Sequence, residues 1–441
     1  MSDSNPSSPE TSSSGLHKTL GPLHLWGIAV GLVISGDYFG WNFGLSVAGF
    51  WEFAVAVFLI AIFYICFALC FTELAASIPH SGGPSAYANQ AFGGWGGFIC
   101  GFLVLVEFVL APPAIASALG GYFHFLFPYI PDVYASYGFF GLLVAFNLFG
   151  VKQTARFELF VTITAICGLL LYLGSILPHF SFASIPDVSR LSKFSFPSFF
   201  QSIPFAIWFF LAVEGVAMAA EEVKDPKKDI PRGYAAGIGT LIFLASSVFI
   251  GTVGVASPEE ISQLDYPLSF VLTKLYGSDS YIAKIFTFIG LFGLIASLFG
   301  IILGYSRLIY ALSKENFLPK FLSKLNSKTH VPNRSVIFGA LIGLVALSIG
   351  NTSELITASA LGACGMYVVS MLSFFVLRKK EPNRIRPYTA PFYPSLAIVA
   401  LVLSAVALIS VIYSNLLVAF IVFCGLILFS AGYMLQSKRK K

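Results

Sequence analysis

Three acidic residues lie inside long apolar stretches of this 441-residue sequence. Asp37 follows Ser35 and Gly36 in the string GLVISGDYFGW. Glu107 lies in LVEFVLAPP, and Glu214 lies in FFLAVEGVAMAA. A charge near the centre of a membrane costs roughly 2.5 to 3.5 kcal/mol on insertion scales, so it usually marks a functional site. We therefore interpret the acids as potential ligand carboxylates, and the stretch around Asp37 as a broken helix.

The composition explains why such stretches exist. Of all residues, 57% are hydrophobic and only 11% are charged, whereas soluble domains average about 25% charged residues. The 46 Phe residues and repeated apolar runs of membrane-span length predict an all-α integral membrane protein. All six cysteines lie in apolar segments, which argues against a disulfide framework and a zinc site. The net charge of +5 follows the membrane topology, so it does not predict nucleic-acid binding.

Motifs for ATP hydrolysis or enzymatic catalysis are missing from the sequence. It contains no GxxxxGK[ST] phosphate loop and no HExxH string, and its six histidines are scattered. A nucleophile beside a base is not visible either. We expect no catalytic residue, no metal site and no cofactor, and we do not expect an enzyme.

Hydrophobic spans follow one another along nearly the whole chain. We count twelve, at residues 23–50, 53–78, 95–120, 134–151, 157–177, 200–220, 233–256, 280–311, 335–350, 355–377, 392–413 and 415–436. The Ser- and Pro-rich residues 1–16 predict a disordered cytoplasmic tail, and residues 437–441 form a basic cytoplasmic tail. Because no charged region precedes a cleavable apolar segment, no signal peptide is predicted.

Lys and Arg gather in alternate connections between the spans. With a cytoplasmic N-terminus, 22 of the 26 basic residues fall inside, and only Arg190, Lys193, Lys274 and Lys284 fall outside. This asymmetry supports the span count. It predicts a multi-pass protein of the cell inner membrane with both termini in the cytoplasm.

Two spans are interrupted in a way that a simple membrane anchor does not need. The 28 residues of span 23–50 would form a helix of about 42 Å, against a hydrocarbon core of about 30 Å. A carboxylate beside a glycine interrupts this span and, five spans later, span 200–220. An odd repeat of five helices turns the second copy upside down, so we predict inverted repeats at 17–178 and 195–380, followed by two helices within 390–436. The Gly-rich loop from His80 to Ala88 is expected to dip into the protein.

Four long strings resemble those of the amino acid–polyamine–organocation permeases. They are VGLVISGDYFGW, TELAASIPHSGGPSAYA, EGVAMAAEEVKDPKKDIPRG and GYSRLIYALSKENFLPKFLSKLN. The strings HLWGIAVGLVISGDYFGWNFG and LVEFVLAPPAIASALG most resemble the ethanolamine permease branch. The resemblance implies a leucine-transporter-like fold of twelve transmembrane helices, with 5+5 inverted repeats and broken helices 1 and 6. It also implies secondary active import of ethanolamine or a related small amine by alternating access.

The resemblance also implies where the substrate binds. In amino-acid carriers of this fold, the break of helix 1 receives the substrate carboxylate, because free N–H groups and a helix dipole favour an anion there. Here Asp37 stands at that place, which suits a cation without a carboxylate, such as ethanolamine. The alternative is that Asp37 only caps a half-helix and that a substrate carboxylate sits at Gly36. The chain would then be an amino-acid permease or an amino-acid/polyamine exchanger; a non-transporting membrane sensor is a remote alternative.

Further residues enter the predicted site through the same resemblance. Glu107 either contacts the ammonium group, takes part in proton coupling or is a structural acid, and Glu214 is a structural or coupling acid. An indole at Trp208 can stack on a cation, which gains roughly 0.5 to 2 kcal/mol, unless it simply packs in the core. Glu73 is interpreted as a packing and gating residue. The predicted substrate-binding residues are Ser35, Gly36, Asp37, Tyr38, Glu107, Trp208, Phe209, Phe210, Ala212 and Glu214, with Tyr38, Phe209 and Phe210 completing an aromatic wall.

Two positions depart from the family pattern. Ala212 stands where many members have a glycine, so the extent of unwinding in helix 6 is open. Ala165 stands where some proton-coupled members have a lysine that substitutes for sodium. Coupling to H+, coupling to Na+ and simple exchange therefore all stay open. The expected partners are a small amine, one of these ions and the lipid bilayer.

Overall fold

A computed structural model describes residues 18–149 and 154–438 of the chain. The predicted tail at 1–16, the end of the predicted span 134–151 with the start of the connection at 152–156, and the last residues of the 437–441 tail lie outside the described residues. Within the described part the fold is helical, and the β-type pairing is limited to one isolated bridge between Leu20 and Val223.

Nine helical segments of the described chain are long and apolar enough to cross a membrane. They are Phe50–Ser77 (α4), Gly94–Leu126 (α6), Asp132–Phe149 (α7), Arg156–His179 (most of α8, Thr154–Ile176, with a 3-10 turn), Phe196–Glu222 (α9, Phe196–Trp208, with α10, Gly215–Met218), Pro226–Val253 (α11), Tyr281–Lys314 (α14), Thr352–Lys380 (α16) and Ser395–Ser414 (α17). Three shorter apolar helices are Pro22–Val33 (α1), Asn333–Ile349 (α15) and Leu416–Ala431 within α18 (Leu416–Lys438). Each predicted span overlaps one of these segments, although α1 covers only the first part of span 23–50, and the nine long segments confirm a multi-pass helical protein.

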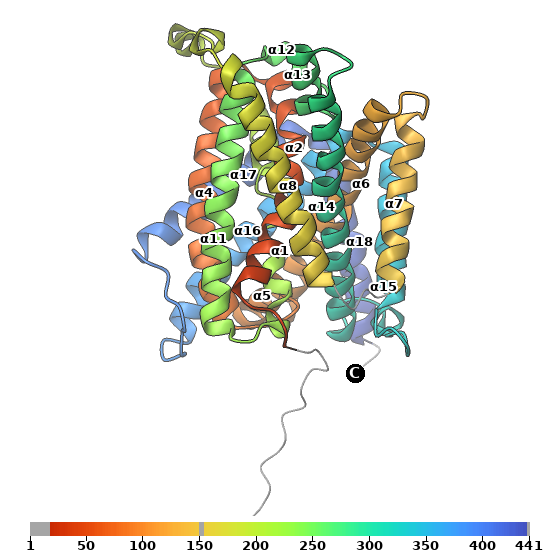
Figure 1. Ribbon diagram of the computed structural model, residues 1–441. Coiled ribbons are helices and arrows are strands. Elements are labelled where there is room, and N and C mark those ends of the chain that lie inside the picture. Colours follow the sequence, from red (N-terminus) through yellow and green to blue (C-terminus); the bar gives the residue numbers. More distant parts are fainter. Residues whose placement is uncertain (1–17, 150–153, 439–441) are drawn as a thin grey trace, which may run out of the picture.

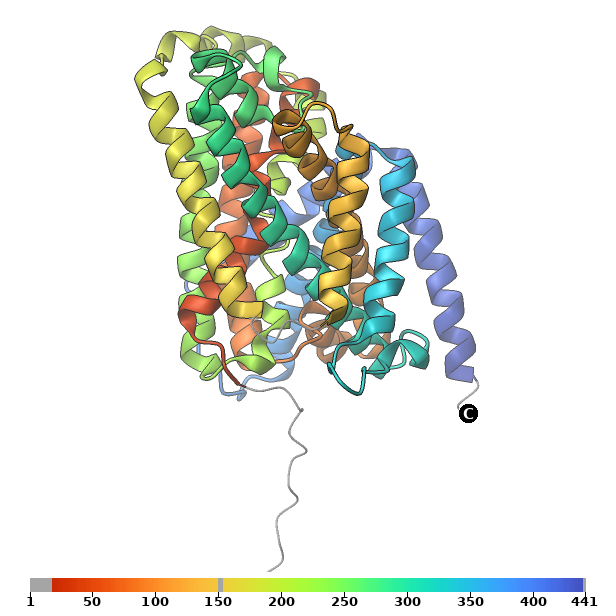
Figure 2. The same cartoon turned by 45° about the vertical axis from the view of Figure 1, so that its right-hand side comes forward.

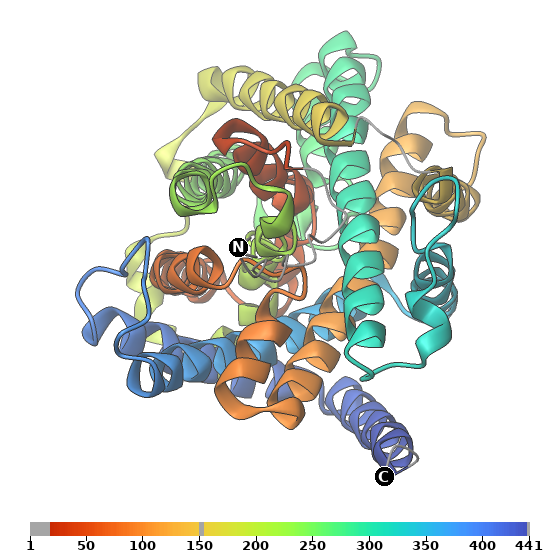
Figure 3. The same cartoon turned by 90° about the horizontal axis from the view of Figure 1, so that it is seen from below.

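The helices form two groups that meet along α1. Helices α1, α4, α9 and α11 pack on one another, and we call them the inner bundle. Helices α6, α8, α14 and α16 pack beside it, and we call them the scaffold; α1 contacts both α8 and α14. Figure 3 shows α1, α4 and α11 near the middle of the molecule, with α7 and α15 on the far side of α14.

The two ends of the molecule differ. The start of α1 and the end of α18 lie at the same end, the lower one in Figures 1 and 2. Two short helices, α12 (Pro258–Ile261) and α13 (Pro267–Tyr276), lie at the upper end. The hydrophobic core runs between these ends and contains large rings such as Tyr64, Tyr122 and Tyr367, all fully buried.

The Gly-rich connection after α4 enters the protein, as expected, but as a helix. His80 to Gly83 form a turn, and Pro84–Phe92 form the short helix α5. Tyr87 and Ala88 are fully buried, and α5 packs against α6 and α16. Its Pro at the first helical turn explains why the helix can begin directly after the glycines.

The first interrupted span breaks later than predicted. Ile34 keeps helical torsion angles between α1 and the short helix α2 (Ser35–Tyr38), so the interruption predicted around Gly36 and Asp37 does not lie at these two residues. The chain becomes extended at Phe39, and Gly40 follows with φ of +93°. This left-handed conformation suits a glycine. The chain then continues through a 3-10 turn, Trp41–Phe43, into α3 (Gly44–Val47).

The second interrupted span breaks between Trp208 and Gly215, so the interruption begins before the predicted Glu214-Gly215 pair and ends at it. Residues 209–214 form successive turns between α9 and α10. Ala212 takes φ of +74°, a conformation that costs a non-glycine residue about 1 to 2 kcal/mol. The family glycine is therefore not needed for the break here, but its replacement leaves local backbone strain.

Candidate functional site

The two breaks touch each other at Gly36 and Trp208. A β-carbon on Gly36 would lie 2.3 Å from the Trp208 carbonyl oxygen, and one on Gly40 would lie 2.3 Å from the indole nitrogen. Both glycines are thus required by close packing. The Trp208 ring also packs edge-on against Phe39, with centroids 5.6 Å apart. The breaks of the first and sixth spans therefore meet at one place, as the sequence predicts.

Asp37 brings an unpaired carboxyl group to this meeting point. The residue is fully buried, and neither carboxyl oxygen accepts a hydrogen bond from any described residue. The capping alternative is therefore wrong in this structure, since an N-cap oxygen must accept a backbone N–H bond. Its short helix α2 packs against α11 and α14. A buried carboxylate without a partner is costly unless a cation or a proton neutralises it.

Glu107 of α6 and Glu214 at the second break come together in the interior. Both are fully buried, and their carboxyl groups interact with each other. The Tyr367 hydroxyl donates to Glu214 Oε2 at 3.3 Å, and it lies 2.9 Å from the Tyr64 hydroxyl. Two interacting carboxylates repel each other, so ionising both without a counter-ion costs free energy. The pair can therefore hold a shared proton or a cation between the inner bundle and the scaffold.

Two residues of this network were missed by the sequence reasoning. Tyr64 of α4 and Tyr367 of α16 connect Glu214 to both helix groups. Their hydroxyl groups were hard to recognise as functional because 16% of the chain is aromatic. The backbone oxygen of Glu107 also accepts a 2.9 Å bond from Ser359, which holds α6 against α16.

The predicted aromatic wall does not form. Tyr38 points into the scaffold, where its hydroxyl donates to the Ala165 carbonyl at 2.7 Å and its ring stacks on Phe286. Phe209 stacks on Trp41 at 5.6 Å, and Phe210 packs near Tyr64 at 5.0 Å. These rings contact different neighbours because the backbone around both breaks is not helical, so that successive side chains point in different directions. Trp208 is the ring that stays at the contact between the breaks.

A cavity of about 150 Å³ lies at the lower side of this cluster. Thr19, Leu20, Glu222 and Arg307 line it near the lower end of the molecule. Further lining residues are Ile28, Leu32, Phe108, Glu158, Gly215, Met218, Ala219, Gly300, Leu303 and Gly304. None of the ten predicted binding residues lines the cavity, but Phe108 and Gly215 directly follow Glu107 and Glu214 in the chain. The cavity therefore approaches the predicted site from the lower end of the molecule, but it does not include any of the predicted binding residues.

Glu158 of α8 is a lining residue that the sequence reasoning missed. It is buried, and both of its carboxyl oxygens lack a hydrogen-bond partner within the described ranges. An acid in an apolar span was the available signal. It lies near the start of the predicted span 157–177, where an acid is easily taken for a solvated helix end.

The described residues contain no group of three His, Cys, Asp or Glu side chains that could hold a metal ion. The cavity walls instead combine apolar surface with Thr19, Glu158 and the ion pair between Glu222 and Arg307. This chemistry suits a small organic ligand or a monovalent cation rather than a tightly held divalent metal.

Comparison with known proteins agrees with this architecture. The family model described as "Amino acid permease" matches residues 20–435. The chain belongs to the amino acid permease family. This permease is 28% identical over 427 residues to an uncharacterized transporter of Rhizobium meliloti, covering 93% of this chain and 90% of the relative. It is 25% identical over 415 residues to the methylthioribose transporter of Bacillus subtilis, covering 89% and 88%. It is 27% identical over 414 residues to the serine/threonine exchanger SteT of Bacillus subtilis, covering 89% and 90%.

Family membership fixes the general class of activity. The permease is a multi-pass membrane transporter with a small-molecule substrate, and the names of its relatives point to transport rather than to an enzyme. These names cover substrates as different as methylthioribose, serine and threonine. The ligand must therefore be inferred from the site of this chain.

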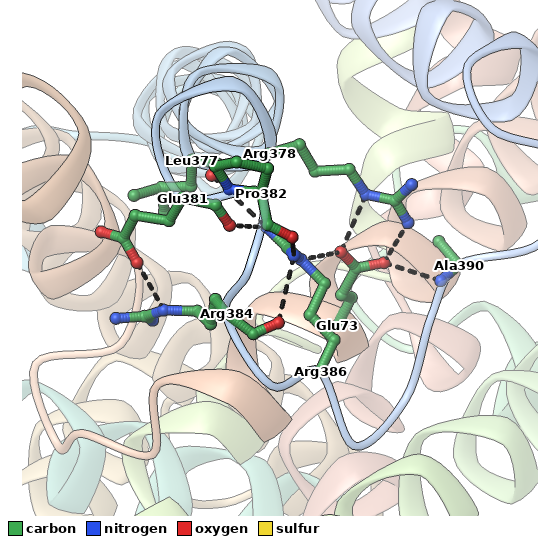
Figure 4. Close-up of polar contacts among 8 residues, drawn as sticks. All are labelled: Glu73, Leu377, Arg378, Glu381, Pro382, Arg384, Arg386 and Ala390. Atoms are coloured by element: carbon green, nitrogen blue, oxygen red, sulfur yellow. Dashed lines mark hydrogen bonds and ion pairs between the residues drawn. The ribbon is translucent and has the colours of Figure 1, made fainter.

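Glu73 forms a second polar cluster at the lower end of the permease. Figure 4 shows Arg378 and Arg386 pointing at its carboxylate from the end of α16 and the following loop. Arg378 Nε donates to Glu73 Oε1 at 2.9 Å, Arg386 Nε lies 3.1 Å from the same oxygen, and the Ala390 N–H donates to Oε2 at 2.7 Å. The Arg378 guanidinium also lies 4.1 Å from the Tyr393 ring centroid. This cluster ties α4 of the inner bundle to α16 of the scaffold, in keeping with the packing role expected for Glu73.

Proposed function

We propose that this permease is a secondary active transporter that imports ethanolamine or a closely related small amine by alternating access. Support comes from the charge of the interior. Asp37, Glu107 and Glu214 are fully buried around the two breaks, whereas no Lys, Arg or His is buried anywhere in the described ranges. The site therefore holds three acids without a basic counterpart among the described residues. A substrate cation would supply the missing charge.

The observation that carries this proposal is the state of the first break. Asp37 has a free carboxyl group there, while Gly36 is closed off by the Trp208 carbonyl. The Phe39 N–H already donates to the Ser35 carbonyl, and the Gly40 N–H donates to Asn42 Oδ1 at 3.0 Å. These amides are not available to an anion. The break is better suited to an ammonium group than to a substrate carboxylate.

The alternative is an amino-acid permease of the same fold. The printed name of SteT, a serine/threonine exchanger, favours it. In that case the substrate carboxylate would have to separate Gly36 from Trp208, and the ammonium group would bind Glu107 or Glu214. An amino-acid/polyamine exchanger would use the same contacts. The two hypotheses therefore differ in whether a carboxylate on the substrate improves binding.

We further propose the twelve-helix, 5+5 inverted-repeat topology for this permease. The nine long segments and three shorter apolar helices are compatible with twelve spans. The breaks at Gly40 and Ala212 lie in spans that are five apart in this count. Because 22 of the 26 Lys and Arg residues fall on one side of such a topology, we place the lower end in the cytoplasm of the cell inner membrane. The cavity would then face inward, the phase in which substrate leaves the protein.

Transport can be tested with the purified permease in proteoliposomes. Uptake of labelled ethanolamine is measured against choline, putrescine, alanine and arginine as unlabelled competitors, with protein-free liposomes as the control. We expect unlabelled ethanolamine to compete strongly and alanine weakly. Strong competition by alanine together with none by ethanolamine would show that the amine hypothesis is wrong. Imposing a pH gradient and a sodium gradient in turn identifies the coupling ion.

A further inference from the structure

The connection between α14 and α15 carries an unbalanced positive charge. It runs from Lys314 to Arg334 at the lower end of the molecule, where Figure 2 shows it in teal between the two helices, and we call it the connector. It contains one acid, Glu315, and five basic residues: Lys314, Lys320, Lys324, Lys328 and Arg334. All five are exposed, and none of them forms an ion pair within the described ranges. The connector therefore presents positive charge that the protein itself does not neutralise.

Basic residues elsewhere at the lower end already have acidic neighbours. Between residues 221 and 232, four basic residues are matched by four acids. At the end of α16, Arg378 and Arg386 bind Glu73, and Arg384 pairs with Glu381 at 2.6 Å. Membrane topology explains why Lys and Arg gather at one end of the molecule. It does not explain why those of the connector are left without acids.

The backbone of the connector is held in place by side-chain hydrogen bonds. The Ser313 hydroxyl donates to the Pro319 carbonyl at 2.7 Å, and the Ser335 hydroxyl donates to the Leu322 carbonyl at 2.9 Å. Between these bonds the chain forms a short 3-10 helix, Lys320–Ser323. The connector is thus ordered before a ligand arrives, which lowers the entropic cost of binding.

Two large apolar side chains are exposed beside the lysines. Phe321 directly follows Lys320, and Leu325 directly follows Lys324. Phe321 is 55% exposed and Leu325 is 40% exposed, whereas Leu322 between them is buried. Contact of such side chains with water is unfavourable. The outer surface of the connector therefore offers both positive charge and apolar area to a partner.

A phospholipid matches this combination. The connector joins α14, which is long enough to cross a membrane, to the shorter apolar helix α15, so it lies at the membrane surface. Clusters of about four to eight Lys or Arg residues beside a membrane helix are typical of sites for anionic lipid headgroups. A nucleic acid or an acidic protein would neutralise the lysines but would leave Phe321 and Leu325 in water. Acyl chains next to a headgroup would bury both side chains.

We propose that the connector binds anionic phospholipids of the adjacent membrane leaflet. Lys320 and Lys324 contact the phosphate group, and Phe321 and Leu325 contact the beginning of the acyl chains. This inference depends neither on the substrate nor on the coupling ion. Because α14 continues from the connector to the cavity, which Arg307 lines, the bound lipid fixes the lower end of a helix in the cavity wall.

Binding can be measured with the purified permease in an uncharged detergent. Phosphatidylglycerol or phosphatidylcholine is titrated into the protein, and the bound lipids are counted by native mass spectrometry. Wild type should prefer phosphatidylglycerol, and Lys320→Gln/Lys324→Gln should bind it at least about fivefold more weakly. Phe321→Ser should also weaken binding, although it leaves the charge unchanged. The matched control Lys227→Gln/Lys228→Gln removes two exposed lysines that lie among acids, and it should bind like wild type.

Cross-linking locates the bound lipid. A phosphatidylglycerol with a photo-reactive headgroup is irradiated with the reconstituted wild type, and labelled residues are mapped by mass spectrometry. We expect label on residues 320–325. Label confined to other parts of the chain, or equal lipid affinity in the two double variants, would overturn the proposal. Displacement of the lipid by inorganic phosphate would show a site for free anions instead. If the connector variants change the oligomeric state and not the lipid preference, the surface joins two copies of the chain and the proposal is wrong.

Discussion

Gly36 of α2 and Trp208 of α9 touch through their backbones, so that a β-carbon on Gly36 would meet the Trp208 carbonyl oxygen at 2.3 Å. This contact joins the two broken spans. The inner bundle is therefore held together at the point where the substrate is proposed to bind. Under the proposed alternating access, this contact would be made and released in each cycle.

Replacing Gly36 by alanine should impair transport. The added methyl group cannot be accommodated without a shift of the Trp208 backbone, and such overpacking costs about 1 to 3 kcal/mol. We expect the initial uptake rate of Gly36→Ala to fall by at least about tenfold. Gly138→Ala is the matched control, because a β-carbon on Gly138 would meet nothing within 4 Å. Equal uptake by the two variants would contradict the importance of the contact.

The left-handed conformation of Ala212 predicts a stabilising substitution. Glycine tolerates φ of +74°, whereas this conformation costs alanine about 1 to 2 kcal/mol. The unfolded chain is more flexible with glycine, and this lowers the gain in folding free energy by about 0.5 to 1 kcal/mol. Ala212→Gly should therefore stabilise the permease by about 0.5 to 1 kcal/mol, measured as a higher melting temperature in detergent. Ala206→Gly, inside α9, should have the opposite effect. A lower melting temperature for Ala212→Gly would show that the strain is not present.

Removing the charge of Glu73 should destabilise the lower end of the permease. Arg378 and Arg386, which both bind this carboxylate, would be left without a counter-ion. Removing one partner of a buried ion pair costs about 3 to 5 kcal/mol of stability. Glu73→Gln should therefore lower the melting temperature clearly. The control Glu381→Gln removes a more exposed partner of Arg384 and should cost at most about 1 kcal/mol. Similar melting temperatures for both variants would contradict a structural role of the Glu73 cluster.

Asp265 should make the stability of the upper end depend on pH. This residue lies between α12 and α13, outside the membrane-spanning helices, and burial raises its pKa from 3.8 to about 6, an effect opposed by a hydrogen bond from Thr352. The folded state then binds the proton more tightly than the unfolded state does. The contribution of Asp265 to stability should therefore be fully present below about pH 4 and be lost as the pH rises to about 6. The loss should amount to about 3 kcal/mol.

The variant Asp265→Asn removes this titration. Its melting temperature should lack the decrease between about pH 4 and about pH 6 that wild type shows. The comparison between the two proteins cancels the contributions of the other acids. An identical pH profile for both would mean that Asp265 stays ionised in the folded permease.

The positions of the spans were predictable because apolar runs of membrane length have few alternatives. The predicted span 355–377, for example, became Thr352–Lys380. The site was harder to predict, since it depends on torsion angles and side-chain directions. The first break was predicted around Gly36 and Asp37, but Gly36 is needed for close packing and Gly40 provides the left-handed turn.

Tertiary contacts decide the rest of the site. Glu107 and Glu214 were both recognised as buried acids, yet only the fold brings their carboxyl groups together. Tyr38 was assigned to the substrate, but its hydroxyl bonds the Ala165 carbonyl of a scaffold helix. Glu158 also lies in an apolar span, and its unpaired state became visible only with the packing of α8 against Gly31 of α1 and Gly300 of α14.

The most direct test of the account is the equilibrium affinity for ethanolamine and for alanine, measured with the purified permease and with Asp37→Asn. The wild type should bind ethanolamine more tightly than alanine. Asp37→Asn should weaken ethanolamine binding by at least about tenfold, because the ammonium group loses its charged partner. Undiminished ethanolamine affinity in Asp37→Asn, or tighter binding of alanine by the wild type, would contradict the proposal that Asp37 receives an amine without a carboxylate.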